Sequence, residues 1–255
     1  MNPLTYERLH SNLLLLKLTT IEQILDNYLE IAAKDGKTTM EVLDHLFEQE
    51  KRYREAAAIE RRTRFAVFPV RKTLDDFDFE FQPSIDRKVI EDLATLRFVH
   101  NAENVVLLGP PGVGKSHLAI ALGMESVKAG FSVYFINTGS LIEKLKKANR
   151  EGVLEKKLRD FTRYKLLIID EMGYLPFDEE GAHCFFQLIS KRYEKSSIIF
   201  TSNKSYGQWG EIFQDNVIAS AVLDRILHHC TTINVKGESY RLKDRKKMGL
   251  QTGKL

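Results

Sequence analysis

The stretch Gly109-Pro110-Pro111-Gly112-Val113-Gly114-Lys115-Ser116 decides the fold of this chain. The apolar residues 105–108 (VVLL) precede it, and the helix-like run 117–122 (HLAIAL) follows it. Strand, glycine-rich loop and helix, in this order, are the setting in which G-x-x-x-x-G-K-[ST] forms a phosphate-binding loop. Glycines let backbone N–H groups turn inward around the phosphates, and the helix N-terminus adds its positive dipole.

The last two residues of the octet predict the ligand. The ammonium group of Lys115 is suited to the β- and γ-phosphates, and the hydroxyl of Ser116 is suited to Mg²⁺. The motif therefore predicts a site for a nucleoside triphosphate, with ATP and Mg²⁺ as the expected cofactors. The residues expected to contact the nucleotide are those of the loop and the start of the helix: Gly109, Pro110, Pro111, Gly112, Val113, Gly114, Lys115, Ser116 and His117.

Apolar strands alternate with helices through the rest of the chain. Strands are predicted at 105–108, 132–136, 165–169, 197–200 and 231–235, and helices at 84–99, from 138 onward, at 179–193 and at 217–229. Such alternation indicates an α/β fold with a parallel sheet between two helix layers. Ligands of these sheets bind at the carboxyl ends of the strands.

Polar residues follow two of these strands. Asp170 and Glu171 come after residues 165–169, and Asn203 follows the next strand. Asp170 is expected to hold Mg²⁺ beside Ser116, and Glu171 to act as the general base that polarises the attacking water. Asn203 would bind that water or the γ-phosphate. An Asp-Glu pair that only caps a helix and an Asn that only forms a turn are the structural alternatives.

The first 64 residues predict a small all-helical domain. Ile21, Leu25 and Leu29 recur at helical spacing, Thr19 or Thr20 offers an N-cap, and Gly36 offers a stop. A second helix begins near Thr38, with Glu41 three residues later. Residues 65–83 read as an extended linker whose aromatic side chains dock on the next domain. Residues 84–255 form the predicted ATPase domain.

Basic residues gather at the end of this helical region: Lys51, Arg52, Arg54, Arg61, Arg62 and Arg64. Two interpretations stay open. The run is either an ordinary solvated helix surface or a contact with the phosphates of nucleic acid. A second group (Lys144, Lys146, Lys147, Arg150, Lys156, Lys157, Arg159) and a third near the C-terminus (Lys243, Arg245, Lys246, Lys247) allow the same two interpretations.

Composition excludes several classes of protein. Hydrophobic residues make up 43% and charged residues 29% of the 255 positions, as in a globular protein, and no apolar run approaches the length of a membrane span. No signal-peptide pattern is present, so a cytoplasmic protein with no membrane partner is expected. Cys184 and Cys230 lack metal-site spacing and are expected to be buried free thiols.

Three longer stretches together resemble a known family. GPPGVGKSHLAIALG (109–123), the run 166–203 (LLIIDEMGYLPFDEE through IIFTSN) and ASAVLDRILHH (219–229) resemble the AAA+ ATPases of the DnaC/DnaI helicase-loader clade. Within that clade the chain is most similar to the IstB-like helper ATPases of insertion sequences. The resemblance extends through the N-terminal helices and FPVRKTLDDFDF (68–79).

The resemblance implies roles that residue spacing does not supply. It makes Arg225 an arginine finger that acts on the ATP of a neighbouring subunit, and it makes Arg241 a candidate phosphate sensor. About twenty residues follow the last predicted strand, which is too few for the usual helical C-terminal lid. The expected fold is therefore an AAA+ ATPase without a full lid.

The resemblance also implies partners. IstB-like proteins assemble with ATP on double-stranded DNA and assist a transposase, so the expected partners are duplex DNA, a transposase and further copies of the chain in a ring or helix. The first alternative is a loader of a replicative helicase. The second is a small-molecule kinase, against which the Asp-Glu pair, Asn203 and Arg225 argue.

Overall fold

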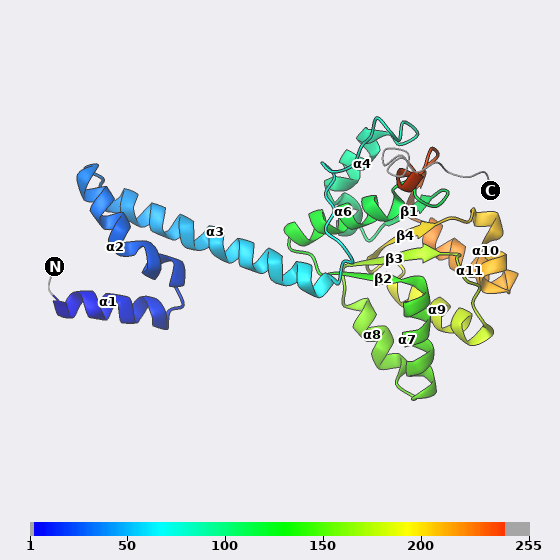
Figure 1. Cartoon of the computed structure of the whole chain (residues 1–255). Coiled ribbons are helices and arrows are strands. Elements are labelled where there is room, and N and C mark those ends of the chain that lie inside the picture. The colour runs from blue at the N-terminus through cyan, green and yellow to red at the C-terminus, as the bar shows by residue number, and fades with distance from the viewer. Residues whose placement is uncertain (1–2, 243–255) are drawn as a thin grey trace. The chain divides into compact units, whose positions relative to one another are not determined.

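The structure is a computed structural model that describes residues 3–242. The chain divides into two compact units, Met1–Arg61 and Arg62–Leu255. The division lies inside one continuous helix, α3 (Thr39–Ala66), rather than at the start of the predicted linker. Figure 1 shows the whole chain, and each unit is described by itself below.

The first unit consists of helices. It contains α1 (Pro3–Leu15), α2 (Thr19–Lys34) and most of α3. Leu13, Ile21, Leu25 and Leu46 form its small buried core, which agrees with the apolar spacing in the sequence. Few apolar side chains are enclosed here, so polar contacts contribute to holding the helices together.

One carboxylate provides such contacts. Glu50 on α3 is 3% exposed, and its Oε2 accepts the backbone N–H groups of Thr20 (2.8 Å) and Ile21 (3.2 Å). These donors belong to the first turn of α2, which begins at Thr19 and has no side-chain N-cap. The predicted cap by Thr19 or Thr20 is therefore wrong, because a residue of another helix supplies the acceptor.

The other predicted helix signals of this unit are confirmed. Thr38 N donates to Glu41 Oε2 at 2.8 Å, and Glu41 N donates back to Thr38 Oγ1, which is the reciprocal contact of a capping box. Gly36, just after α2, has a φ of 64°, the left-handed conformation that ends helices.

The second unit is built on one parallel sheet. Its strands are β1 (Asn104–Leu108), β2 (Val133–Asn137), β3 (Leu166–Met172), β4 (Ser197–Ser202) and β5 (Cys230–Asn234), in the order β2-β3-β4-β1-β5. All four strand pairs are parallel. The apolar residues of β1, β3 and β4 are nearly all inaccessible, as runs covered on both faces require.

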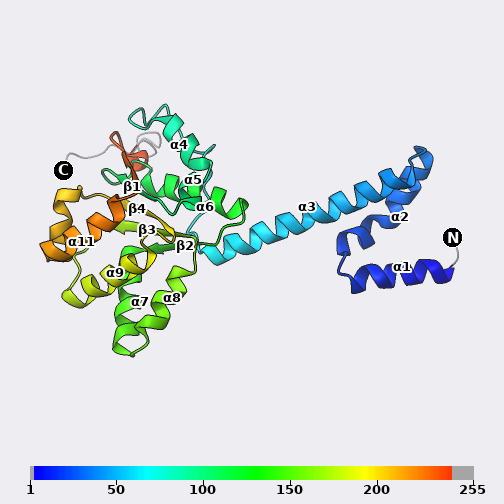
Figure 2. The same cartoon turned by 180° about the vertical axis from the view of Figure 1, so that it is seen from behind.

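Helices cover both faces of this sheet. Figures 1 and 2 show α4 (Arg87–Ala94) and α6 (Lys115–Lys128) on one face, and α7 (Thr138–Arg150), α8 (Leu154–Thr162) and α9 (Glu179–Arg192) on the other. The short α10 (Trp209–Phe213), preceded by the 3-10 turn Tyr206–Gln208, and α11 (Asn216–Leu227) pack at the end of the second layer. The predicted α/β fold with two helix layers is confirmed.

One predicted helix is wrong in form. Instead of a single helix over 84–99, the chain forms α4, capped by Asp86, and the four-residue α5 (Arg97–His100). Leu96 between them has a φ of 65°, which no α-helix can contain. Leu96 is buried, so its side chain gains apolar contacts that offset the unfavourable backbone conformation.

Two expectations drawn from composition can be compared with the structure. Among residues 3–242, no helix is long and apolar enough to cross a membrane. Both cysteines are free. Cys184 is buried as expected, whereas Cys230 is only partly covered.

Residues 67–85 belong to the second unit, contain no regular helix or strand, and are called the strap below. Its residue Phe68 is near Gly123 of α6, where an added Cβ would lie 2.9 Å from the ring. Gln82 Nε2 donates to the carbonyl of Glu238 at 2.8 Å, and Ser84 Oγ donates to that of Lys236 at 2.6 Å. The strap is therefore fixed at both ends, as expected for a segment that docks.

Candidate nucleotide site

The phosphate loop lies between the end of β1 and the start of α6, and its glycines are required by shape. Gly109 has a φ of 151°, and a Cβ there would lie 2.1 Å from the carbonyl oxygen of Val235. Gly114 has a φ of 100°, and a Cβ there would meet the ring of Phe77 at 2.6 Å. A side chain at either position would clash with neighbouring residues, which explains why only glycine fits.

Lys115 is the first residue of α6 and is only 7% exposed. Its Nζ donates to the carbonyl oxygens of Gly109 and Pro110, both at 2.7 Å. Burial lowers the pKa of Lys115 to about 8, an effect that Asp170 and Glu171 oppose and Arg241 reinforces. The ammonium group is thus held in the loop with little solvation, which strengthens its attraction to an anion.

Three oxygen-bearing side chains meet at the ends of β3, β4 and the loop. Asp170 Oδ1 accepts hydrogen bonds from Ser116 Oγ at 2.8 Å and from Thr201 Oγ1 at 2.5 Å. Asp170 is 8% exposed and Thr201 is 1% exposed. A carboxylate next to two hydroxyls is a hard-oxygen set that suits Mg²⁺. The predicted neighbourhood of Ser116 and Asp170 is present.

Glu171 owes its position to an irregularity in β3. Its φ is 61°, and the pairing of β3 with β4 shifts register between Ile169 and Met172. Such a bulge turns a side chain toward the rim of the sheet. The backbone N–H of Glu171 donates to Thr201 Oγ1 at 3.0 Å, which fixes the bulge.

The carboxylate of Glu171 is held by Asn137, the last residue of β2. Asn137 Nδ2 donates to Glu171 Oε2, while Asn137 Oδ1 accepts the N–H of Gly139 at 2.9 Å and so caps α7. The cap of α7 is therefore Asn137, and not Thr138, the first residue of the helix. Thr138 Oγ1 instead donates to the backbone carbonyl of Asp170 at 2.7 Å.

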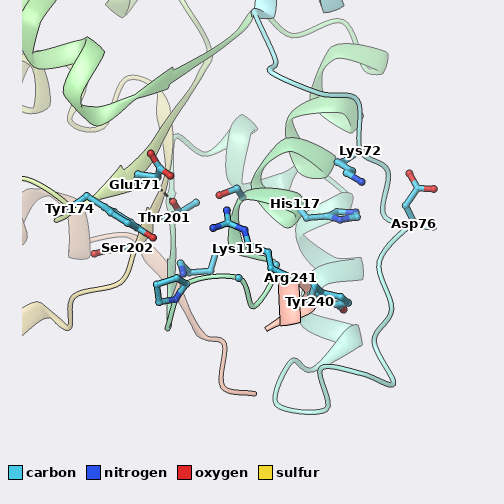
Figure 3. A pocket seen from close by; sticks show the side chains of 14 residues that line it. Lys72, Asp76, Lys115, His117, Glu171, Tyr174, Thr201, Ser202, Tyr240 and Arg241 are labelled. Carbon is cyan, nitrogen blue, oxygen red and sulfur yellow. Dashed lines mark hydrogen bonds between the residues drawn. The ribbon is translucent and has the colours of Figure 1, made fainter. Parts of the chain in front are cut away.

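Lys115, Ser116, Glu171 and Thr201 line one cavity, shown in Figure 3. On one side lie Glu171, Tyr174, Thr201 and Ser202, and on the other lie Lys72, Asp76 and His117, with Lys115 and Arg241 between them. Pro111, Gly112, Gly114, Ser116 and Tyr240 complete the lining. The cavity therefore has cationic groups near the loop and carboxylates at opposite sides.

The strap contributes the wall next to α6. The Nε2–H of His117 donates to the carbonyl of Thr73 at 2.9 Å, and the ring of Phe77 meets that of His117 edge-on at 5.3 Å. Burial lowers the pKa of His117. Tyr240 donates its hydroxyl to the carbonyl of Asp78 at 2.7 Å, which brings Arg241 to the cavity.

Two predicted catalytic residues do not line this cavity. Asn203 follows β4, and its buried Oδ1 meets no hydrogen-bond partner among the described residues. Arg225 lies on α11, where its guanidinium packs 4.9 Å from the ring of Phe186 and donates to the carbonyl of Ala221. Their proposed roles in catalysis stay predictions.

The basic residues of α3 differ in their surroundings. Lys51 and Arg52 form surface ion pairs with Glu48 at 2.9 and 3.2 Å. Arg54 pairs with the buried Glu50 at 2.8 Å and donates to the carbonyl of Lys17, so it supports the fold of the first unit. Arg61 and Arg64 are exposed and Arg62 is partly covered. The third basic group, Lys243, Arg245, Lys246 and Lys247, lies outside the described residues.

Sequence reasoning missed two residues of the site. Asn137 was hidden at the end of a strand predicted one residue short, although an Asn after an apolar run and before Thr-Gly is a common helix cap. Thr201 stood beside Asn203 in the strand-end triplet 201–203 (TSN). Adjacent residues of a strand point to opposite faces, so the triplet alone could not show which side chain meets Asp170.

The parallel sheet, the phosphate loop and the Ser116–Asp170 pair define a P-loop nucleotide-binding protein of the AAA+ class. Solved structures of that class share the fold. The chain resembles the crystal structure of DnaI (TM-score 0.55, 23% identity, 65% of this chain and 92% of that chain). It also resembles AMPPCP-bound DnaA from Aquifex aeolicus (TM-score 0.52, 18% identity, 71% of this chain and 57% of that chain).

The chain belongs to the family of IstB-like ATP binding proteins, whose model matches residues 11–248. It is 51% identical over 237 residues to a Pseudomonas aeruginosa protein assigned to insertion sequence IS21 as ATP-binding, covering 93% of this chain and 89% of that protein. A Geobacillus stearothermophilus protein of insertion sequence IS5376 with the same assignment is 46% identical, covering 94% and 96%. The resemblance seen in the sequence is confirmed.

Proposed function

We propose that this chain is an ATPase that assembles with ATP on duplex DNA and assists the transposase of an insertion sequence. The observation that carries the ATPase part is the contact of Ser116, Asp170 and Thr201 beside the buried Lys115. Family membership and the insertion-sequence relatives support the link to transposition.

Each side chain of the site would have a separate role in ATP hydrolysis. Lys115 would neutralise the β- and γ-phosphates, and Ser116 with Asp170 would hold Mg²⁺, which supplies charge stabilisation when bound. Glu171 would take a proton from the attacking water once its carboxylate leaves Asn137. Asn203 would orient this water from the next strand, and Arg241 would contact the phosphates from the C-terminal side.

Arg225 would complete the site of a neighbouring copy. It lies on α11, outside the lining of its own chain's cavity, as an arginine that acts between subunits must. Assembly into a ring or helix of identical chains would place it against another chain's ATP. An arginine supplied in this way is worth roughly 10³ to 10⁵ in rate.

The DNA contact is proposed for the basic residues of α3, with Arg61, Arg62 and Arg64 preferred. Arg54 is the least available, because its guanidinium is already engaged by Glu50 and Lys17. Lys51 and Arg52 could exchange Glu48 for phosphate at little cost, since exposed ion pairs contribute about 1 kcal/mol or less.

The deciding experiment compares the binding of duplex and single-stranded DNA by the full chain. Binding is measured with ATP, with ADP and without nucleotide across a series of salt concentrations, and assembly mass is followed in parallel. We expect multimers on duplex DNA that require ATP and weaken as salt rises. The Lys115→Ala variant, which should not bind ATP, serves as the control.

Three outcomes would contradict the proposal. A preference for single strands, or DNA binding only in the presence of a replicative helicase, would instead identify a helicase loader. Duplex binding that is equally strong without ATP and in Lys115→Ala would separate DNA binding from the nucleotide site.

A further inference from the structure

Two histidines and a glutamate meet on the surface of the second unit, away from the nucleotide cavity. Glu194 follows α9, and His228 and His229 follow α11. His228 Nδ1 lies 3.6 Å and His229 Nε2 lies 3.8 Å from the same oxygen, Glu194 Oε1. The three side chains are about half exposed, at 51 to 54%. This set is called the His-Glu cluster below.

The backbone around the cluster is held by one residue. The backbone N–H of Asn104, at the start of β1, donates to the carbonyl of His229 at 2.8 Å. Its side-chain Nδ2 donates to the carbonyl of Ile226 at 3.0 Å, and its Oδ1 accepts the N–H of Ile198 at 3.0 Å. The turns before β4 and β5, which carry the cluster, are thus tied together across β1.

The spacing of the ligand atoms is close to that of a metal centre. Tetrahedral ligands about 2.0–2.1 Å from Zn²⁺ lie roughly 3.3 Å apart. One ligand atom from each residue of the His-Glu cluster lies within 4.8 Å of the other two. The side chains are half exposed, so small rotations can bring the ligand atoms from this separation to that of a tetrahedral site.

Some groups near the His-Glu cluster oppose the binding of a cation there, and others favour it. The hydroxyl of Tyr193 lies 2.7 Å from His228 Nδ1, so a metal bound at that atom would displace this hydrogen bond. Arg225, one turn before the histidines, lines the same small cavity as Tyr193 and Glu194 and repels a cation. Asp224, on α11, carries a negative charge on the same side as Tyr193 and so attracts a cation.

We propose that Glu194, His228 and His229 bind a divalent metal ion of the zinc type. Imidazole nitrogens suit Zn²⁺, Co²⁺, Ni²⁺ and Cu²⁺, whereas Mg²⁺ prefers oxygen ligands alone. The site is distinct from the Ser116–Asp170 pair, because it precedes strands β4 and β5 while the nucleotide cavity lies at the carboxyl ends of β1, β3 and β4. A bound ion would join the turn after α9 to the end of α11 and stabilise the second unit.

The test uses the full chain without a histidine tag, stripped with a chelator and kept free of nucleotide and Mg²⁺. Titration with Co²⁺ should give the intense visible absorption of a tetrahedral ion at one equivalent, and Zn²⁺ should displace it. His228→Gln and His229→Gln should each weaken Co²⁺ binding at least tenfold, as even outer-shell changes in metal sites do.

Two variants serve as controls. His183→Gln removes an exposed histidine elsewhere on α9, and Asp170→Asn removes the carboxylate of the Mg²⁺ candidate. Both should leave the cobalt spectrum unchanged. Zn²⁺ at a hundredfold excess over its Kd should raise the Tm of the unaltered chain by about 5–10 °C, and that of the double variant His228→Gln/His229→Gln much less.

Folding of the two histidine variants is checked by nucleotide binding, which depends on the other end of the sheet. The proposal is overturned if no tetrahedral cobalt spectrum forms, or if the spectrum survives in the double variant. Equal loss of binding in His183→Gln would also overturn it, because binding would then be spread over surface histidines.

Discussion

At the scale of single residues, Lys115 combines burial with a charge that its proposed ligand requires. Its pKa is lowered to about 8, whereas bound phosphates would raise it. Binding therefore takes up a proton above this value. Below about pH 8 the ammonium is already present and the affinity for ADP or ATP should not change with pH.

The first prediction is the loss of nucleotide affinity as pH rises through 8. Each further pH unit should weaken binding about tenfold until the pKa of the complex is reached, as proton linkage requires. Isothermal titration between pH 7 and 9.5 measures this slope. In the Lys115→Arg variant the side chain stays charged, so any remaining affinity should be independent of pH over this range. A flat profile for the unaltered chain would contradict the prediction.

Asn137 carries the second prediction at this scale. Its amide donates to Glu171 while its oxygen caps α7. Asn137→Asp keeps an oxygen for the cap but replaces the donor with a like charge, so Glu171 is released. We expect ATP turnover without DNA to rise about five- to tenfold, the equivalent of one hydrogen bond of about 1–1.5 kcal/mol.

A coupled phosphate-release assay measures this turnover. The double variant Asn137→Asp/Glu171→Gln should lose the gain and fall at least 100-fold below the unaltered chain, because the general base is absent. A reduced basal rate in Asn137→Asp alone would show that Asn137 supports Glu171 rather than restraining it.

At the scale of elements, the basic residues of α3 fall into two groups. One group fits a solvated helix surface, and the other remains available for a contact with the phosphates of DNA. Lys51, Arg52 and Arg54 make ion pairs with α3 carboxylates, as a solvated helix surface does. Arg61 and Arg64 lie farther along the helix, and both are exposed. The structure thus directs the DNA hypothesis to the C-terminal end of the helix.

The third prediction concerns the salt dependence of DNA binding. Each phosphate contact contributes about 0.9 to the slope of log K against log salt. The double variant Arg61→Gln/Arg64→Gln should therefore lower the slope by about two. Arg87→Gln, which removes an exposed arginine paired with Glu91 on α4, is the matched control and should not change it. An unchanged slope in the α3 variant would remove Arg61 and Arg64 from the DNA interface.

The elements also show how far sequence could predict this molecule. The strands and most helices could be predicted, because burial on one or both faces leaves periodic apolar patterns. The break at Leu96 and the bulge at Glu171 could not, since both depend on backbone conformations that tertiary contacts stabilise. The loop, Asp170 and Glu171 were identified from motifs, whereas Asn137 and Thr201 required knowledge of which side chains meet across strands.

At the scale of the whole molecule, the fourth prediction tests action between copies. Arg225→Ala should keep ATP binding and lose hydrolysis. Mixing it with Glu171→Gln, which lacks the base, should restore part of the activity, because an intact Arg225 of one chain can face an intact Glu171 of another. Loss of the cation–π contact with Phe186 should lower stability by about 0.5–1 kcal/mol only.

The measurement is ATPase rate against mixing ratio at constant total protein, with mass checked at each ratio. Arg225→Lys is the control for charge, since it keeps the cation but not the planar geometry. A rate that never exceeds the average of the two separate variants, in mixtures shown to co-assemble, would place Arg225 outside an intersubunit site.

The contact of Phe68 with Gly123 has a consequence for how such proteins exchange parts during evolution. If recombination at the start of α4 joined the ATPase domain to a new N-terminal segment, the new protein would lack the strap. It would lose the neighbour of His117 and the acceptor for Tyr240. A viable recombination point therefore lies before Phe68, and the helices upstream of it are the part that a gene fusion can replace.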